Sequence, residues 1–247
     1  MILTGKRAVL TGAGGGIGRA MMEALRAAGA TVVACDRAGS APEADEMVEF
    51  DITDVAESEA AAARIAEKPV DVLISNAGGS RTDLMEQTDS AVIQAEMQLN
   101  FTGAAVFSRA LLPAMRGRPD GAAAVFVASV NGLAHYGNPA YSAAKAGLIA
   151  WSRALATEEG RLGIRSNVVA PGSVHTAAWD ERKARQPEIF GRVTGLYPLG
   201  RLVRPEEVAN AAIFLASSLS SGVTGTVLPV DAGLTAGNLP FIDIISG

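Results

Sequence analysis

Short apolar runs alternate along the chain with longer alanine-rich segments, in which apolar residues recur at helical spacing. Runs bounded by glycine, proline and aspartate predict buried strands, and the alanine-rich segments predict helices. The expected strands are residues 7–11, 31–35, 48–50, 70–74, 122–128, 165–169 and 227–230. The expected helices are residues 17–28, 54–67, 90–115, 139–161 and 205–216, with Asp54 and Asn138 as N-caps.

Strands that alternate with helices in this way are typical of a parallel sheet. Because the runs are apolar throughout rather than at every second position, we expect helices to cover both faces of the sheet. Right-handed crossovers then give a doubly wound α/β fold of the Rossmann type. No linker or internal repeat interrupts the pattern, so we expect a single domain over residues 1–247.

Residues 173–204 depart from this rhythm. They contain three aromatic residues, Trp179, Phe190 and Tyr197, and a mixed run of charges from residue 180 to 185. A long segment between regular elements is often a lid or a binding region. The alternative is a pair of surface helices that only caps the sheet. We treat residues 173–204 as a candidate substrate-binding lid.

Composition narrows the class of protein. The chain is 49% hydrophobic and 19% charged, which excludes disorder, and no apolar run is long enough to span a membrane. A net charge of −5 offers no generic basic footprint for nucleic acid. One cysteine, Cys35, and two separated histidines give neither an internal disulfide nor a metal cluster. Since no apolar signal segment precedes Gly12, we expect a cytoplasmic protein.

The first candidate site is the glycine-rich turn between the first strand and the first helix. Its pattern is Gly12-x-x-x-Gly16-x-Gly18, a longer turn than the G-x-G-x-x-G dinucleotide fingerprint. Glycines allow bare backbone N–H groups to approach a pyrophosphate, whose charge the N-terminus of the following helix favours. A turn of this kind alone is often only a turn.

Asp36 strengthens the nucleotide interpretation. It ends the second strand, where a carboxylate can accept both ribose hydroxyls of an adenosine and would repel a 2′-phosphate. The glycine turn also lacks a lysine or arginine between Gly12 and Gly18. Both observations favour NAD over NADP. Arg37 argues against a preference for NAD, because a guanidinium beside Asp36 could tolerate a 2′-phosphate.

Tyr141 and Lys145 form the strongest constellation. They lie four residues apart early in an expected helix, so they share one face of it. A tyrosine has an ordinary pKa near ~10, and an ammonium one turn away favours the phenolate and lowers that pKa. Ser129, just past the fifth strand, can donate a hydrogen bond to a substrate oxygen at the same point. A Tyr-x-x-x-Lys pair in isolation is often a solvated helix face.

In order along the chain, these motifs resemble the short-chain dehydrogenase/reductase family over essentially the whole length. The resemblance rests on residues 11–18, Asp36, residues 51–52, residues 75–78, Asn100, Ser129, residues 141–145, Asn167, residues 171–176, residues 223–225 and residues 230–233. It implies a Rossmann-type domain with a seven-stranded parallel sheet, and hydride transfer between a nicotinamide and an alcohol or carbonyl carbon.

The resemblance also implies residue roles. Tyr141 is the general acid/base, Ser129 orients the substrate oxygen, Lys145 lowers the tyrosine pKa and holds the nicotinamide ribose, and Asn100 holds a water of a proton relay. Asp51 and Ile52 flank the adenine, and Thr176 contacts the carboxamide. The full set of expected cofactor-binding residues is Gly12, Gly15, Gly16, Ile17, Gly18, Asp36, Arg37, Asp51, Ile52, Asn76, Ala77, Gly78, Tyr141, Lys145, Pro171, Gly172, Val174 and Thr176.

We therefore expect an NAD-dependent enzyme that acts on a small secondary alcohol or ketone, such as a sugar or polyol. The first alternative is an NADP-dependent 3-oxoacyl-type reductase, which the cationic residues Arg182, Lys183 and Arg185 keep open. The second is a catalytically silent NAD-binding protein, disfavoured because Asn100, Ser129, Tyr141 and Lys145 are all present.

The substrate pocket and the chain end carry the last two expectations. Candidate wall residues of the pocket are Arg81, Asn131, His135, Tyr136, Ser173 and Trp179. Residues 239–245 are apolar for a chain end, and such a tail is normally tied down. We expect it to pack on a neighbouring subunit, in a homotetramer of the kind the resemblance implies.

Overall fold

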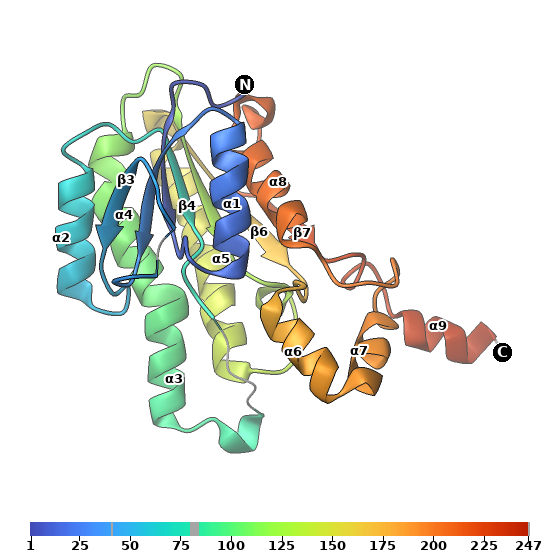
Figure 1. Ribbon diagram of the computed structural model, residues 1–247. Coiled ribbons are helices and arrows are strands. Elements are labelled where there is room, and N and C mark those ends of the chain that lie inside the picture. Colours follow the sequence, from blue (N-terminus) through green and yellow to red (C-terminus); the bar gives the residue numbers. More distant parts are fainter. Residues whose placement is uncertain (41, 80–83, 247) are drawn as a thin grey trace.

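The computed structural model describes residues 1–40, 42–79 and 84–246, and its described strands form one seven-stranded parallel sheet (Figure 1). The strand order is β3-β2-β1-β4-β5-β6-β7. The strands are β1 (Arg7–Thr11), β2 (Thr31–Asp36), β3 (Glu46–Glu49), β4 (Val72–Ser75), β5 (Ala122–Val127), β6 (Ile164–Pro171) and β7 (Val227–Val230). The order runs outwards in both directions from β1 and β4, which confirms the doubly wound topology.

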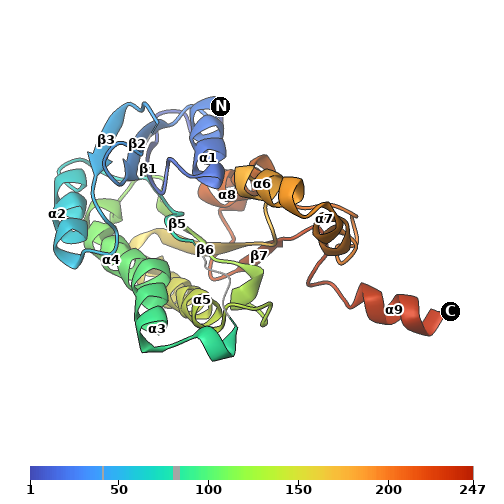
Figure 2. The same ribbon diagram turned by 60° about the horizontal axis from the view of Figure 1, so that its bottom comes forward.

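Helices cover both faces of the sheet, and each face has its own core. On one face α1 (Gly16–Ala27) packs against α8 (Pro205–Ala216). On the other, α2 (Val55–Ile65) packs against α4 (Gly103–Met115), and α5 (Pro139–Glu159) lies along β6. Figure 2 shows the sheet between these two layers. The expectation of helices on both faces is confirmed.

The strands supply both cores through their alternation. Val9 of β1 and Phe126 of β5 lie in the core under α2, α4 and α5, whereas their neighbours Leu10 and Val125 lie in the core under α1 and α8. All four side chains are fully buried. Because successive residues of a strand point to opposite faces, burial of both faces requires a continuous apolar run. This is why the strand pattern in the sequence shows no polar alternation.

The long helix expected over residues 90–115 is interrupted, so that prediction was wrong in its continuity. The structure has α3 (Ser90–Met97), a π-helical segment (Gln98–Thr102) and α4. Gly103 lies against the backbone of Ile52, and a side chain there would collide with the Ile52 carbonyl group. The close approach of these two backbones is possible only with glycine.

The two expected N-caps behave differently. Asp54 caps α2 by accepting a hydrogen bond from the Glu57 backbone N–H at 3.0 Å, as predicted. Asn138 precedes α5 in a left-handed conformation with φ 53° and ψ 71°, and its side chain makes no capping hydrogen bond. Its carbonyl oxygen instead accepts hydrogen bonds from the Ser142 backbone N–H and hydroxyl, at 2.8 and 2.9 Å. Asn138 therefore occupies the predicted N-cap position, with Pro139 first in the helix, but its side chain does not supply the cap.

Residues 173–204 contain two short helices, α6 (Ala177–Arg185) and α7 (Pro187–Thr194), beside the carboxyl ends of the strands (Figure 1). The chain ends in α9 (Leu239–Ser246), which projects away from the rest of the molecule in both views (Figures 1 and 2). Within the described ranges, no helix has the length and apolarity needed to cross a membrane.

Candidate active site

A cleft of about 1460 Å³ opens at the carboxyl ends of the parallel strands. The glycine turn follows β1, Asp36 ends β2, Asn76 follows β4, Ser129 follows β5 and Pro171 ends β6. All of these lie along the cleft, because parallel strands present their carboxyl ends at one edge of the sheet. Every expected cofactor-binding residue lines it, as do the expected catalytic residues other than Asn100.

The glycine turn is packed tightly against the segment after β4. Gly12 has a positive φ of 68°, and a Cβ atom there would lie 2.8 Å from the Ala77 Cα. The Asn76 Nδ2 donates to the Gly12 carbonyl oxygen at 3.0 Å, and the Thr11 hydroxyl oxygen accepts from the backbone N–H groups of Asn76 and Ala77. A side chain at Gly12 would therefore push the two segments apart.

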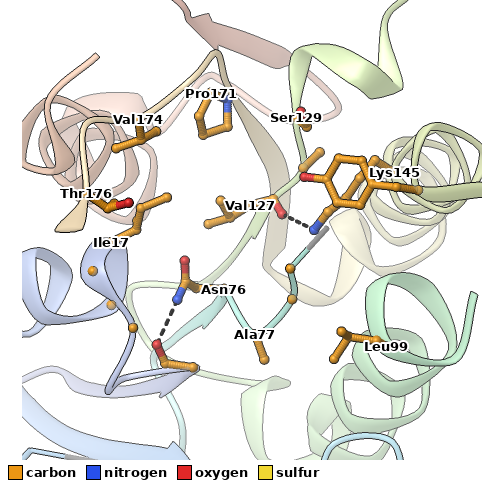
Figure 3. A pocket seen from close by; sticks show the side chains of 18 of the residues that line it. Ile17, Asn76, Ala77, Leu99, Val127, Ser129, Lys145, Pro171, Val174 and Thr176 are labelled. Atoms are coloured by element: carbon orange, nitrogen blue, oxygen red, sulfur yellow. Dashed lines mark hydrogen bonds between the residues drawn. The ribbon is translucent and has the colours of Figure 1, made fainter. Parts of the chain in front are cut away.

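This turn fits a dinucleotide pyrophosphate. Helix α1 begins at Gly16 with no side-chain cap, so the N–H groups of its first turn are available at the cleft. Across the cleft, the Thr176 Cγ2 would lie 2.9 Å from a Cβ on Gly16. Figure 3 shows Ile17, Thr176 and Val174 together on this side. The absence of side chains at Gly12, Gly16 and Gly18 lets the turn pack closely against its neighbours, while its backbone lines the cleft.

Asp36 closes the adenosine end of the cleft. Its Oδ2 accepts a hydrogen bond from the Gly14 backbone N–H at 2.8 Å, and its Oδ1 accepts one from the Arg37 backbone N–H at 2.8 Å. The carboxylate is thereby fixed beside the glycine turn. Nearby, hydrogen bonds from the Thr53 hydroxyl and backbone N–H hold the pKa of Asp51 below its ordinary value, and the Arg37 charge acts in the same direction.

Ser129, Tyr141 and Lys145 also line the cleft, and Figure 3 shows Ser129 and Lys145 on the side away from Ile17 and Thr176. The Lys145 Nζ donates to the Val127 carbonyl oxygen at 3.0 Å and lies 5.6 Å from the centroid of the Tyr141 ring. Lys145 is only 3% exposed, and burial lowers its pKa to about 8, against the opposing charge of Glu96.

The tyrosine pKa differs from the expectation. We expected the Lys145 ammonium to lower it, but burial raises the pKa of Tyr141 above its ordinary value of 10. The hydrogen bond with Ser129 acts in the lowering direction, and the negative charge of Glu96 adds to the rise. Desolvation penalises the phenolate more than its neighbours stabilise it. In this structure Tyr141 is therefore a protonated phenol at neutral pH.

Asn100 lies behind the cleft rather than in its wall. It belongs to the π-helical segment and is 1% exposed. Its Nδ2 donates to the Gly79 carbonyl oxygen at 2.9 Å, and its Oδ1 accepts from the Gly79 backbone N–H at 3.1 Å. A Cβ atom on Gly78 would lie 2.8 Å from the Asn100 Oδ1 and 3.1 Å from the Lys145 Nζ. A side chain at position 78 would therefore collide with both Asn100 and Lys145, which only a glycine there allows to come this close.

The expected substrate wall is largely brought together. Asn131, Tyr136, Ser173 and Trp179 line the cleft. His135 is exposed and is not among the described lining residues, and Arg81 lies outside the described part of the chain. Aromatic and charged contacts join the helices of the candidate lid: the Arg182 guanidinium lies 5.1 Å from the Trp179 ring, and the Trp179 and Phe190 ring centroids are 6.2 Å apart.

The sequence predicts Tyr197 and Arg182 only as members of the candidate lid segment, and it does not identify Glu96, Leu99 and Leu234 as residues of the site. Tyr197 is 3% exposed, and its hydroxyl accepts a hydrogen bond from the Ser173 backbone N–H at 3.0 Å, which anchors the segment after β6. Glu96 lies behind the cleft, bonded to Asn100 at 2.7 Å. Leu99, Arg182, Leu196 and Leu234 also line the cleft. An isolated aromatic, acidic or apolar residue carries no sequence signal that separates such roles from ordinary packing.

Comparison with known proteins places this architecture in a family. A family model described as enoyl-(acyl carrier protein) reductase matches residues 12–235. The chain is 37% identical to a galactitol 2-dehydrogenase (L-tagatose-forming) of Cereibacter sphaeroides, over 94% of this chain and 96% of that protein. It is 34% identical to a 3-oxoacyl-(acyl-carrier-protein) reductase of Escherichia coli, over 95% of this chain and 99% of that protein.

A solved structure agrees with these relatives. A short-chain dehydrogenase/reductase from Burkholderia thailandensis superposes with a TM-score of 0.90 at 42% identity, covering 98% of this chain and 97% of that chain. The chain belongs to the short-chain dehydrogenase/reductase family, as its motifs indicated. It is an oxidoreductase of a family that acts on alcohol and carbonyl groups with a nicotinamide cofactor.

Proposed function

We propose that the protein is an NAD-dependent dehydrogenase of a small secondary alcohol, with Tyr141 as its general acid/base. The observation that carries the proposal is that the expected catalytic residues and the expected cofactor-binding turn line one cleft. Ser129, Tyr141 and Lys145 lie at one end, and the glycine turn with Asp36 lies at the other. The cleft is therefore suited to hold a dinucleotide with its reacting end beside the tyrosine.

The chemistry divides between the cofactor and the chain. When bound, the nicotinamide ring accepts or donates the hydride. The Tyr141 hydroxyl exchanges the proton of the substrate oxygen, and the Ser129 hydroxyl donates a hydrogen bond that holds this oxygen. Lys145 keeps a positive charge beside the phenol, and Asn100 supports the wall behind it through Gly79.

The raised pKa of Tyr141 has a directional consequence. A protonated phenol is ready to donate its proton to a carbonyl oxygen, whereas oxidation of an alcohol needs the phenolate. Alcohol oxidation should therefore become faster as the pH rises towards the pKa of Tyr141, while carbonyl reduction should not.

The test of this role is Tyr141→Phe. The ring and its packing are kept while the proton-transfer group is lost, so we expect turnover to fall by about 10²-fold or more, the scale of general acid–base catalysis, with NAD affinity within about threefold of the wild type. Turnover is measured from reduced-nicotinamide absorbance against a panel of sugars, polyols and secondary alcohols. Near wild-type turnover would contradict the mechanism. Absence of turnover with every substrate, in a wild type that binds NAD, would favour the silent-protein alternative.

The preference for NAD rests on Asp36. Its carboxylate stands beside the glycine turn, where it would accept ribose hydroxyls and repel a 2′-phosphate. Arg37 also lines the cleft and leaves residual use of NADP open. We expect Asp36→Ser to raise kcat/KM for NADP by about tenfold or more and to lower it for NAD. A wild type that prefers NADPH would overturn this assignment.

Two substrate classes follow from the relatives and the cleft. A sugar or polyol is favoured by the polar wall of Asn131, Tyr136 and Ser173, and by the similarity to a galactitol dehydrogenase. A 3-oxoacyl substrate with NADPH is the alternative, supported by the similarity to the E. coli reductase and by Arg182 in the cleft wall. Parallel assays of polyols with NAD and of a 3-oxoacyl thioester with NADPH separate the two.

The tetramer and the cytoplasmic location also remain proposals. Phe241, Ile242, Ile244 and Ile245 of α9 are 51–78% exposed, an apolar surface that a neighbouring subunit would cover. We expect a tetrameric mass by light scattering at micromolar concentration, and a smaller assembly for the double variant Phe241→Asp, Ile245→Asp. A monomeric wild type would contradict the proposal. Cell fractionation tests the location.

A further inference from the structure

Glu96 is an unusual residue to find at its position. Helix α3 has eight residues, and Glu96 is the one that is buried, at 5% exposure, while Ile93 on the same helix is 45% exposed. Burying a carboxylate is costly unless hydrogen bonds or an opposite charge compensate it. A helix that buries an acid rather than an apolar residue must gain something specific from that acid.

One part of the compensation is the hydrogen bond to Asn100. The Asn100 Nδ2 donates to the Glu96 Oε2 at 2.7 Å, across the junction between α3 and the π-helical segment. A carboxylate can only accept, so it faces the amide nitrogen and fixes which way the Asn100 amide points. In that orientation the amide meets both backbone groups of Gly79, as donor at 2.9 Å and as acceptor at 3.1 Å.

The second part is charge. The Asn100 Oδ1 and the Lys145 Nζ both lie against Gly78, so the chain Glu96–Asn100–Gly78 leads directly to the Lys145 ammonium. Helices α3 and α5 pack against each other here. The carboxylate opposes the effect of burial on the pKa of Lys145 and adds to the raised pKa of Tyr141.

We propose that Glu96 is a positioning residue of the active site, which fixes the Asn100 amide against Gly79 and supplies the buried negative charge that balances Lys145. This inference rests on the proposed function, because it assigns Glu96 to the Tyr141–Lys145 pair. It adds a fifth member to the group formed by Asn100, Ser129, Tyr141 and Lys145.

No other described ionisable group competes for this role. The segments that also pack around Lys145, β5 and residues 130–132, carry no ionisable side chain, and neither does the π-helical segment. On β6 the Arg165 guanidinium binds the carbonyl groups of Leu215 and Ser217. On α4, Arg109 is exposed. On α5, Arg153 lies two turns beyond Lys145, Glu158 lies farther still, and Glu159 is paired with Arg116.

The experiment measures Lys145 directly and needs no substrate. The four lysines are labelled with ¹³C at Cε, the signal of Lys145 is assigned by its loss in Lys145→Met, and its titration is followed from pH 6 to 10. Two unit charges roughly 10 Å apart at an effective dielectric constant of about 20 shift a pKa by roughly one unit. We expect the Lys145 midpoint, near pH 8 in the wild type, to fall by roughly one unit in Glu96→Gln.

Two further variants complete the design. Glu86→Gln removes an equal charge from an exposed side chain in the segment before α3 and should leave the midpoint unchanged. Glu96→Asp keeps the charge but shortens the arm to Asn100, so the midpoint should stay within a few tenths of a unit while kcat falls by about tenfold.

The outcomes separate cleanly. A midpoint in Glu96→Gln equal to that of Glu86→Gln would overturn the proposal, even in an active enzyme. A lowered midpoint supports it, even if no alcohol of the panel is oxidised, in which case the proposed function fails and the electrostatic role of Glu96 stands. If Glu96→Gln does not fold, the positioning role is tested by the kcat of Glu96→Asp, and a wild-type kcat in that variant would overturn it.

Discussion

Lys145→Met is expected to make the protein more stable at neutral pH while it removes catalysis. Lys145 is 3% exposed, and burial lowers its pKa from 10.5 to about 8. A depression of that size corresponds to about 3 kcal/mol that the folded state loses by keeping the ammonium charged at pH 7. Loss of the hydrogen bond to the Val127 carbonyl offsets about 1 kcal/mol, so we expect a net gain of about 2 kcal/mol.

The pH dependence gives the stricter test. Because the folded pKa lies below the unfolded one, the unfolded state binds more protons between about pH 8 and 10.5, and wild-type stability rises with pH in that window. Lys145→Met lacks this titration. The excess free energy of unfolding of Lys145→Met over the wild type should therefore be largest below about pH 7. It should shrink by about 2 kcal/mol by pH 9.5.

The assay is urea unfolding followed by circular dichroism at several pH values, at one protein concentration and without cofactor. Lys68→Met is the matched control, because Lys68 is 64% exposed. The difference in free energy of unfolding between Lys68→Met and the wild type should therefore not vary over this pH range. The reasoning would be refuted if the difference in free energy of unfolding between Lys145→Met and the wild type were constant with pH. It would also be refuted if the wild type were more stable than the variant at pH 7.

Two further predictions test the cofactor turn and the start of α8. In Gly18→Ala the new Cβ would meet the backbone of Gly12 and Ala13. We therefore expect a loss of roughly 1–3 kcal/mol of stability, and NAD binding at least about tenfold weaker by calorimetry. Gly160→Ala, whose new Cβ meets nothing within 4 Å, should change neither stability nor binding. Glu207, whose pKa the hydrogen bonds from Arg201 and Arg204 lower to about 2, should stabilise the fold fully above about pH 4.5 and lose this effect as the pH falls towards 2. Glu207→Gln should accordingly melt below the wild type at pH 7, with a difference that narrows in acid; a difference independent of pH would contradict the assignment.

The sequence allowed most of the sheet to be predicted, because each buried strand must be apolar on both faces and each connection must begin or end with a recognisable glycine, proline or N-cap. Val9, Leu10, Val125 and Phe126 illustrate this, since neighbours in the chain serve opposite cores. The site motifs were visible for a related reason: the strand ends gather at one edge of a parallel sheet.

What could not be predicted depends on distances between segments far apart in the chain. The helix over residues 90–115 is interrupted just before Gly103, whose backbone lies against that of Ile52, a contact that no local pattern encodes. The raised pKa of Tyr141 follows from burial, which outweighs the hydrogen bond with Ser129. Glu96 is a single acidic residue in a helix, and only its contact with Asn100 distinguishes it from a solvated surface group.

The π-helical segment has a consequence for how this site could arise or be lost. A π turn closes its hydrogen bonds over one residue more than an α turn, so it corresponds to one inserted residue in an otherwise regular helix. Deleting one residue between Gln98 and Thr102 would restore the uninterrupted helix that the hydrophobic pattern describes. It would also rotate the residues on one side of the deletion by about 100° relative to those on the other, so the side chains of α3 and α4 would no longer face their present neighbours together. The active site thus depends on a length, as well as on the identity of its side chains.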